Sequence, residues 1–186
     1  MDTANSQGWR VTWALLLLLP TAVSAGETHL VINGVSHHIN SSYEWNENHA
    51  GFGVEQELGK SSNWSHRVSA NAFRDSNDDM SYMVGTTLHR RLITLPYLDD
   101  LSLSAGLTAF MMTRSDANDG MPFPGILPSL SLGNKDYGIN ITYMPVKGIE
   151  QMTDTRSKDP TLEGIIFAQF RISFDRIATT TWRSGR

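Results

Sequence analysis

Apolar and polar residues alternate with a period of two along most of the chain. Between Leu101 and Met111 every second residue is apolar, and the same alternation returns from Ile166 to Phe174. This alternation places successive side chains on opposite faces of a β-strand and does not produce a helical stripe. The pattern predicts eight strands, at about 28–38, 50–59, 64–73, 80–89, 101–112, 126–133, 136–144 and 163–174.

The first 25 residues follow a different pattern. A single basic residue, Arg10, precedes an apolar run from Val11 to Val23, and small residues follow at Ala22–Ala25. A basic flank, a short apolar run and small residues at the end are typical of a secretory signal peptide. A membrane-spanning helix needs about 20 apolar residues, which is more than this run supplies. We therefore predict a signal peptide at 1–25 and an exported chain after it.

Eight strands of about ten residues in an exported chain match a small outer-membrane barrel. Hydrocarbon tolerates no unpaired sheet edge, so the sheet must close on itself. We therefore expect an all-β fold, an eight-stranded antiparallel β-barrel over 26–174, embedded in the outer membrane of the cell, with Gln169 and Arg171 facing its lumen. Residues 175–186 form a C-terminal extension whose composition allows disorder. A soluble barrel with an apolar interior would show the same alternation.

Composition excludes several classes of function. The chain of 186 residues carries 15 Lys and Arg against 19 Asp and Glu, a net charge of −4, which disfavours binding to nucleic acid. It has no cysteine, so disulfides, thiolate metal sites and cysteine nucleophiles are excluded. His37 and His38 are adjacent, unlike paired metal ligands, and no carboxylate cluster accompanies them. We expect neither a metal site nor a cofactor.

The connections between the predicted strands alternate in length. The first, third, fifth and seventh connections are generally the longer ones, as in the outward loops of membrane barrels, with Arg90–Asp100 as an unusually long turn at the opposite end. In this topology His37 and His38 end the first strand at the outer rim, and Asp75 and Ser76 follow the third strand there. An imidazole, a carboxylate and a hydroxyl on one rim suit nucleophile activation, although Asp-Ser is also a common turn sequence.

Several stretches carry a resemblance to a known family. They are His37-His38 with Trp45-Asn46-Glu47 and Gly51-Phe52-Gly53, then Ala72–Ser76, then Pro122–Leu130 with Ile141–Pro145, in an order that spans roughly 28–174. The sequence resembles the PagP-type lipid A palmitoyltransferases of the outer membrane. The resemblance implies a membrane-embedded monomeric barrel that moves a palmitoyl or similar chain from a phospholipid to the lipid A of lipopolysaccharide.

The family's functional residues are a rim histidine and an adjacent Asp-Ser, which correspond here to Asp75 and Ser76. His38 is the preferred histidine, because relatives keep a Ser-x-His pattern, and His37 is the second choice. The implied mechanism is acyl transfer with the histidine as general base, acting either on Ser76 or directly on the acceptor hydroxyl. The sequence leaves the covalent and direct routes open.

The lumen of the predicted barrel is the expected acyl pocket. Met83, Gly85 and Thr87 share the inward parity of the fourth strand, and Gly106 lies beside them. Counting from Ser76, Thr87 stands where the family has a glycine at the pocket floor, which implies a shorter acyl chain. The prolines in 122–128 and at Pro145 predict interrupted strand pairing, which in the family matches a lateral doorway for lipid.

Three other functions fit parts of the pattern. A non-enzymatic structural or adhesion barrel of the same strand number is the main alternative. A lipid A deacylase needs a late His-x-Ser motif, and no histidine follows His89. A soluble lipocalin-like carrier would not fractionate with outer membranes.

Overall fold

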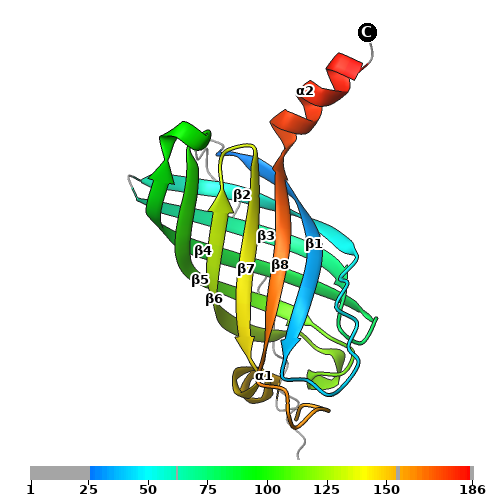
Figure 1. Cartoon of the computed structure of the whole chain (residues 1–186). Coiled ribbons are helices and arrows are strands. Elements are labelled where there is room, and N and C mark those ends of the chain that lie inside the picture. The colour runs from blue at the N-terminus through cyan, green and yellow to red at the C-terminus, as the bar shows by residue number, and fades with distance from the viewer. Residues whose placement is uncertain (1–25, 62, 154–155, 185–186) are drawn as a thin grey trace, which may run out of the picture.

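The chain folds into a closed barrel of eight antiparallel strands in the computed structural model (Figure 1), which describes residues 26–61, 63–153 and 156–184. The predicted signal peptide lies outside the described residues. Each strand pairs with the next along the chain, and β8 pairs with β1. The strands are β1 (Thr28–Ile39), β2 (Gly51–Ser61), β3 (Trp64–Arg74), β4 (Met80–Leu95), β5 (Leu101–Thr113), β6 (Phe123–Gly133), β7 (Tyr137–Pro145) and β8 (Gly164–Ser173).

The eight-stranded antiparallel barrel expected from the alternation is thus confirmed, and two strand boundaries differ from the expected ones by three residues or more. The expectation of a long turn over Arg90–Asp100 is wrong, because β4 continues to Leu95 and pairs with β5 as far as Leu101. Only the 3-10 turn Pro96–Leu98 and two further residues connect these strands. β6 begins at Phe123, ahead of the predicted start at 126.

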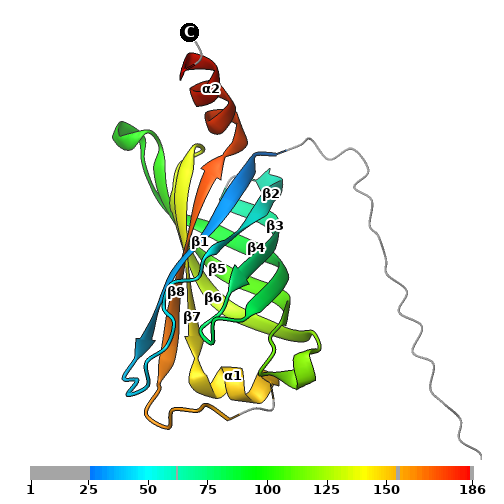
Figure 2. The ribbon, with the colours of Figure 1, turned by 90° about the vertical axis from the view of Figure 1, so that its right-hand side faces the viewer.

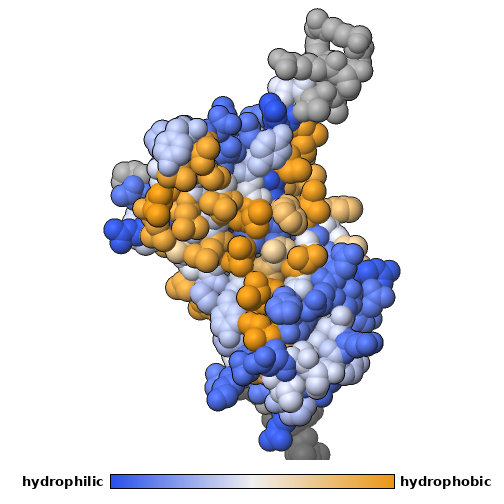
Figure 3. Space-filling model, in the orientation of Figure 1, coloured by the Kyte–Doolittle hydropathy of each residue, from blue (hydrophilic) through white to orange (hydrophobic). Residues whose placement is uncertain are grey.

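The barrel is apolar outside and largely polar inside. Large apolar side chains stand exposed on its outer surface, among them Phe52, Val54, Tyr82, Val84, Leu88, Leu107, Ile126, Leu130, Ile141, Tyr143, Ile166 and Phe170. On the face shown in Figure 3, apolar side chains form a band that crosses several strands. Gln169 and Arg171 are buried in the lumen, as the sequence predicted. A soluble barrel would have the opposite arrangement, so this surface is built for hydrocarbon.

The two ends of the barrel differ. The outer rim, as we name it, carries the connections 40–50, 75–79, 114–122 and 146–163, and helix α1 (Val146–Thr153) lies across it (Figure 2). The opposite end carries the short turns and helix α2 (Phe174–Ser184), which projects away from the barrel (Figure 1). The extension after Phe174 is therefore helical through Ser184. Neither helix in the described ranges is long and apolar enough to cross a membrane.

A β-bulge in β1 reverses which of its residues face inward. Pairing with β8 shifts register between Asn33 and Val35, so Gly34 is an extra residue. Before the bulge the buried positions are odd-numbered, and after it Ser36 and His38 are buried. A Cβ at Gly34 would lie 2.7 Å from the Ala168 carbonyl oxygen, so the close approach of the two strands requires glycine.

Pairing between β6 and β7 is incomplete near the outer rim. The two strands pair only from Ser129 opposite Thr142 down to Gly133 opposite Gly138. Above that point β6 pairs with β5 alone, through a segment that contains Pro124 and Pro128. The interrupted pairing that the prolines predicted is therefore present, because a proline has no N–H to donate to a neighbouring strand.

Candidate active site

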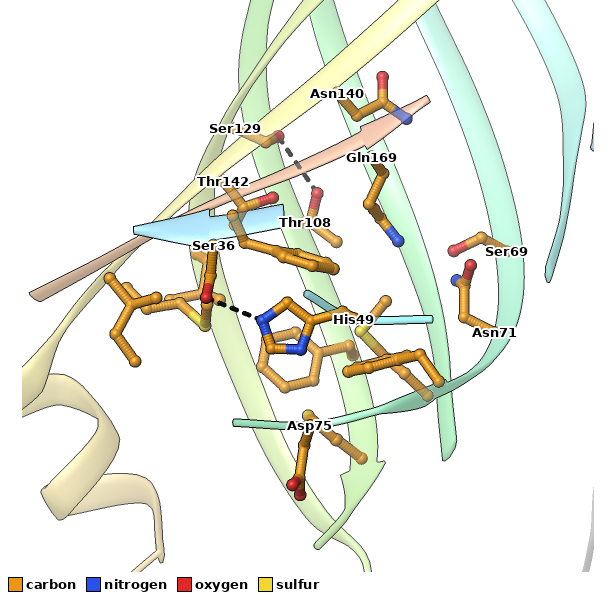
Figure 4. A pocket seen from close by; sticks show the side chains of 18 of the residues that line it. Ser36, His49, Ser69, Asn71, Asp75, Thr108, Ser129, Asn140, Thr142 and Gln169 are labelled. Atoms are coloured by element: carbon orange, nitrogen blue, oxygen red, sulfur yellow. Dashed lines mark hydrogen bonds between the residues drawn. The ribbon is translucent and has the colours of Figure 1, made fainter. Parts of the chain in front are cut away.

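A cavity occupies the outer half of the lumen (Figure 4). An apolar cluster built on Phe110, Phe123 and Leu127 forms much of its wall. Four methionines pack against this cluster and line the same cavity: Met83, Met112, Met144 and Met152. Flexible methionine side chains adapt to an elongated apolar guest. The cavity therefore suits a hydrocarbon chain that enters from the rim.

A layer of hydroxyl groups bounds the apolar part of the cavity. Thr87 Oγ1 and Thr108 Oγ1 lie 2.9 Å apart, and Thr108 donates to Ser129 Oγ at 3.1 Å. His89 Nε2 lies 2.9 Å from the same serine oxygen. We call Thr87, Thr108, Ser129 and His89 the hydroxyl layer. Burying methylene groups stabilises a bound chain only as far as the apolar wall extends, so this layer marks its lower limit.

Of the four residues predicted to line the acyl pocket, two line the cavity and two do not. Met83 and Thr87 line the cavity. Gly85 shares their inward parity, but Phe110 covers it, because a Cβ there would lie 3.3 Å from the Phe110 Cβ. Gly106 is required for another reason, since a Cβ there would collide with the Leu88 carbonyl oxygen and lie 2.8 Å from the His89 ring. Neither glycine is among the residues that line the cavity, so the expected room beside them is filled.

The structure separates the two adjacent histidines. The His38 side chain is 2% exposed and faces inward, whereas the His37 side chain is 72% exposed. His38 Nδ1 donates to Glu47 Oε1 at 3.2 Å, and the His38 backbone N–H donates to the same oxygen at 2.9 Å. The backbone bond lowers the pKa of Glu47 and keeps it ionised. This fixes the Nδ1–H tautomer, so Nε2, which has no hydrogen-bond partner in the described part of the chain, carries a lone pair that can accept a proton.

The His38 ring is also held from its face. Trp45 stacks on it with ring centroids 5.1 Å apart and planes within 10° of parallel. Trp45 Nε1 donates to Ser41 Oγ at 2.8 Å, and Ser41 Oγ donates to Asp159 at 2.7 Å. Bonds from Thr161 and Ser41 lower the pKa of Asp159, so it remains a charged acceptor. The connection between β7 and β8 thereby supports the orientation of the histidine.

Asp75 is the organising residue of the connection between β3 and β4. It is 1% exposed and accepts three hydrogen bonds: from the Asn77 N–H at 2.9 Å, the Asp79 N–H at 3.2 Å and Ser81 Oγ at 2.9 Å. Arg114 Nε lies 3.8 Å from its Oδ2. No hydrogen bond joins Asp75 to His38 in the described ranges. The carboxylate that orients the histidine is Glu47.

Ser76 lies where two hollows meet. It borders the main cavity with Asp75, and it borders a second hollow at the rim with His38, Trp45 and Arg114. The Asn46 N–H donates to the Ser76 carbonyl oxygen at 3.1 Å, and Asn46 Nδ2 donates to the Asp75 carbonyl oxygen at 3.2 Å. These bonds tie connection 40–50 to connection 75–79. They bring His38 and Ser76 to one hollow, and the described structure contains no direct hydrogen bond between the two.

Two side chains at the site were not predicted from the sequence to be functional. Glu47 belongs to Trp45-Asn46-Glu47, which was noted only as part of a resemblance. His49 lies inside the cavity, with its Nε2 2.8 Å from Ser36 Oγ (Figure 4). The shift of inward parity at Gly34 places Ser36 and His38 together on the inner face, and the alternation in the sequence gives no signal of it.

A barrel with an apolar exterior, a partly apolar cavity in the outer half of its lumen and an inward-facing histidine at the rim defines a class. It is the class of small outer-membrane-type barrels that handle lipid chains. The model of the family described as "Antimicrobial peptide resistance and lipid A acylation protein PagP" matches residues 19–152. The chain belongs to the PagP family.

Curated relatives agree with this assignment. Over 128 residues the chain is 30% identical to the protein named lipid A acyltransferase PagP from Bordetella pertussis strain Tohama I, covering 64% of this chain and 68% of the relative. A protein of the same name from Methylobacillus flagellatus is 32% identical over 83 residues, or 45% of this chain and 43% of the relative. Another, from Laribacter hongkongensis, is 34% identical over 103 residues, or 55% and 48%.

Proposed function

We propose that this protein is an outer-membrane acyltransferase that moves a palmitoyl or similar chain from a phospholipid to lipid A. The observation that carries the proposal is the apolar cavity, which opens toward a rim hollow containing both His38 and Ser76. Membership of the PagP family and the names of the relatives support lipid A as the acceptor. No part of the proposed reaction requires a metal or a cofactor.

The interrupted pairing between β6 and β7 supports a membrane lipid as the donor. Hydrocarbon outside the barrel meets the unpaired segment of β6 directly, next to the cavity wall formed by Phe123 and Leu127. An acyl chain that enters there remains in an apolar environment throughout. Each buried methylene contributes about 0.8 kcal/mol, so the cavity can hold the chain while its ester stays at the mouth.

In the proposed reaction His38 acts as general base at the cavity mouth. Its Nε2 accepts the proton of the attacking hydroxyl, while Glu47 holds the ring and stabilises the positive charge that develops on it. Asp75 holds the connection that carries Ser76. Positioned base catalysis of this kind contributes about 10²–10⁴-fold to the rate.

The activity is tested by the mass of lipid A in cells that express the protein and lack any related enzyme. Added acyl mass supports a transferase, lost acyl mass indicates a deacylase, and unchanged mass indicates a structural barrel. A phospholipid donor with an isotope-labelled chain, supplied to the purified protein with lipid A, tests the donor. Absence of label in lipid A while unlabelled acylation continues would contradict a phospholipid donor.

Replacing Ser76 tests the assigned site. We expect Ser76→Ala to lower lipid A acylation by about tenfold or more, because the hydroxyl borders both hollows at the mouth. Ser115→Ala is the control, since Ser115 is exposed on a neighbouring connection and should leave acylation unchanged. Unchanged acylation in Ser76→Ala would show that the assignment of Ser76 is wrong.

Thr87 is expected to set the chain length. Thr87→Gly removes one member of the hydroxyl layer and extends the space below the apolar wall, so longer chains should appear on lipid A. Thr86→Gly makes the same change on the outer face of β4 and should leave the chain profile as in the wild type. Mass profiling of lipid A measures both, and identical profiles for wild type and Thr87→Gly would refute a role for Thr87.

We further propose that residues 1–25 are a cleaved signal peptide and that 26–174 act as a monomeric barrel in the outer membrane. The closed pairing of β1 with β8 supports a monomer, because it leaves no sheet edge to join to another chain. The N-terminal sequence of the membrane-extracted protein and its mass in detergent test these points. A start at Met1 would contradict cleavage.

A further inference from the structure

Two buried side chains inside the cavity form a pair that the proposed reaction has not used. Ser36 and His49 are 5% and 3% exposed, and both line the cavity. Ser36 Oγ lies 2.8 Å from His49 Nε2 (Figure 4), although the two residues come from β1 and from the connection that follows it. A serine hydroxyl that is hydrogen-bonded to an imidazole is the usual arrangement of an activated nucleophile.

The direction of this hydrogen bond is determined by the other ring nitrogen. His49 Nδ1 lies 2.8 Å from the Arg74 carbonyl oxygen, which can only accept, so Nδ1 carries the proton. Burial lowers the pKa of His49 and keeps the ring neutral. Nε2 therefore accepts the Ser36 hydroxyl proton, as a general base requires.

The ring of His49 cannot rotate freely. Phe73 and Phe167 meet it edge to face, with centroid distances of 6.2 and 5.2 Å. The backbone on both sides is fixed as well, because the His49 N–H donates to the Gly34 oxygen and the Ser36 N–H donates to the Glu47 oxygen, each at 2.9 Å. The pair is thus oriented before any substrate binds.

The other buried serine–histidine pair of the cavity lacks this arrangement. His89 Nε2 lies 2.9 Å from Ser129 Oγ, but His89 Nδ1 is buried without a hydrogen-bond partner among the residues that the structure describes. No acceptor therefore fixes the His89 tautomer. Ser129 also belongs to the hydroxyl layer below the apolar wall, whereas Ser36 lies two residues from His38 on the same inner face, about 7 Å along the strand.

We propose that Ser36 is the nucleophile of a covalent route, in which the acyl chain is held as an ester on Ser36 between donor and acceptor. This inference rests on the proposed acyl transfer. It chooses the covalent route over direct transfer, a choice that the sequence leaves open. Ser36 Oγ attacks the carbonyl carbon of the donor ester and gives its proton to His49 Nε2. The ester C–O bond breaks, and the departing lysophospholipid oxygen takes that proton.

The second half of the reaction returns the enzyme to its starting state. A hydroxyl of the acceptor attacks the carbonyl carbon of acyl-Ser36 and gives its proton to His38 Nε2. The bond to Ser36 Oγ breaks, and that oxygen takes the proton from His38. Two histidines thus serve the two halves, His49 for loading and His38 for release.

Separate histidines predict that an acyl-enzyme can be trapped. His38→Phe keeps an aromatic ring for Trp45 but removes the base for release, so the purified protein should gain one acyl mass when given phospholipid and lipid A. Peptide mapping should place the acyl group on Ser36. The double variants that add Ser36→Ala or His49→Asn should gain none, while adding Ser115→Ala, at an exposed position outside the cavity, should leave the adduct in place.

A reactive probe tests the nucleophile independently of lipid A. A long-chain alkyl fluorophosphonate forms an O–P bond with an activated serine and releases fluoride. We expect it to label Ser36 in the wild type, at a rate at least about 100-fold lower in His49→Asn, whose side-chain amide N–H can still donate to the Arg74 oxygen. The heat-dependent electrophoretic shift of closed barrels verifies that each variant is folded.

The outcomes separate this inference from the proposed function. If the wild type acylates lipid A while Ser36 takes neither probe nor acyl group, the covalent route through Ser36 is wrong and the transferase stands. If the wild type leaves lipid A unchanged but the probe labels Ser36 through His49, the proposed function fails and the nucleophile stands. An adduct on Ser76 would also overturn the assignment to Ser36.

Discussion

Replacing His38 by phenylalanine should lower lipid A acylation by about 10²-fold or more. The substitution keeps a ring against Trp45 and removes the Nε2 lone pair and the contact of Nδ1 with Glu47. The expected loss is therefore chemical, since the packing of the ring is retained. The mass of lipid A from cells with equal amounts of folded barrel in the outer membrane measures it.

His37→Phe is the matched control for this prediction. The same residue type is changed one position away, but the His37 side chain points out of the barrel. Acylation should stay within about twofold of the wild type, since a change on the solvated face seldom affects a site inside. Full activity in His38→Phe together with a loss in His37→Phe would mean that the inward ring is not the base.

Asp75→Ala should both destabilise the barrel and abolish acylation. The substitution leaves the buried Ser81 hydroxyl and the partly buried N–H groups of Asn77 and Asp79 without their acceptor. Hydrogen bonds to a charged group contribute about 1.5–3 kcal/mol each, and their loss is partly relieved by water, so we expect a loss of about 3 kcal/mol in the free energy of unfolding. Denaturant unfolding of the barrel in lipid vesicles measures the change.

Asp78→Asn is the control within the same connection. Asp78 is exposed and has a positive φ of 66°, a conformation that asparagine also adopts readily. Its ion pair with Arg74 lies at the surface and contributes at most about 1 kcal/mol. Equal losses of stability in Asp75→Ala and Asp78→Asn would show that Asp75 does not organise this connection.

The alternation of side chains was sufficient to predict the strands that cross the membrane. A strand with hydrocarbon on one side and a polar lumen on the other must alternate, so its position can be found from the sequence. β4 shows the limit of this signal. Beyond Arg90 it continues to Leu95 with most side chains exposed, so the alternation ends although the strand does not. The predicted strand ended at the point where side chains on both faces of β4 become exposed.

The interior of the site was less predictable, because it depends on register. The sequence preferred His38 on a resemblance, but the physical reason is the bulge at Gly34, which no alternation rule reveals in advance. The bond between Ser36 and His49 joins residues 13 positions apart through a connection whose path is irregular. Because they have no side chain, Gly85 and Gly106 predict open space in the lumen. In the barrel, Phe110 and His89 fill that space.

The extra residue in β1 also has an evolutionary consequence. A single-codon deletion at Gly34 would remove the extra residue and leave a regular strand, in which Asn33 and Val35 keep their partners on β8 and His38 still faces the lumen. A relative that lacks this codon can therefore keep its histidine in the lumen without any other change in the strand. Across the family, the length of the first strand should vary by one residue at this point while the histidine stays on the inner face.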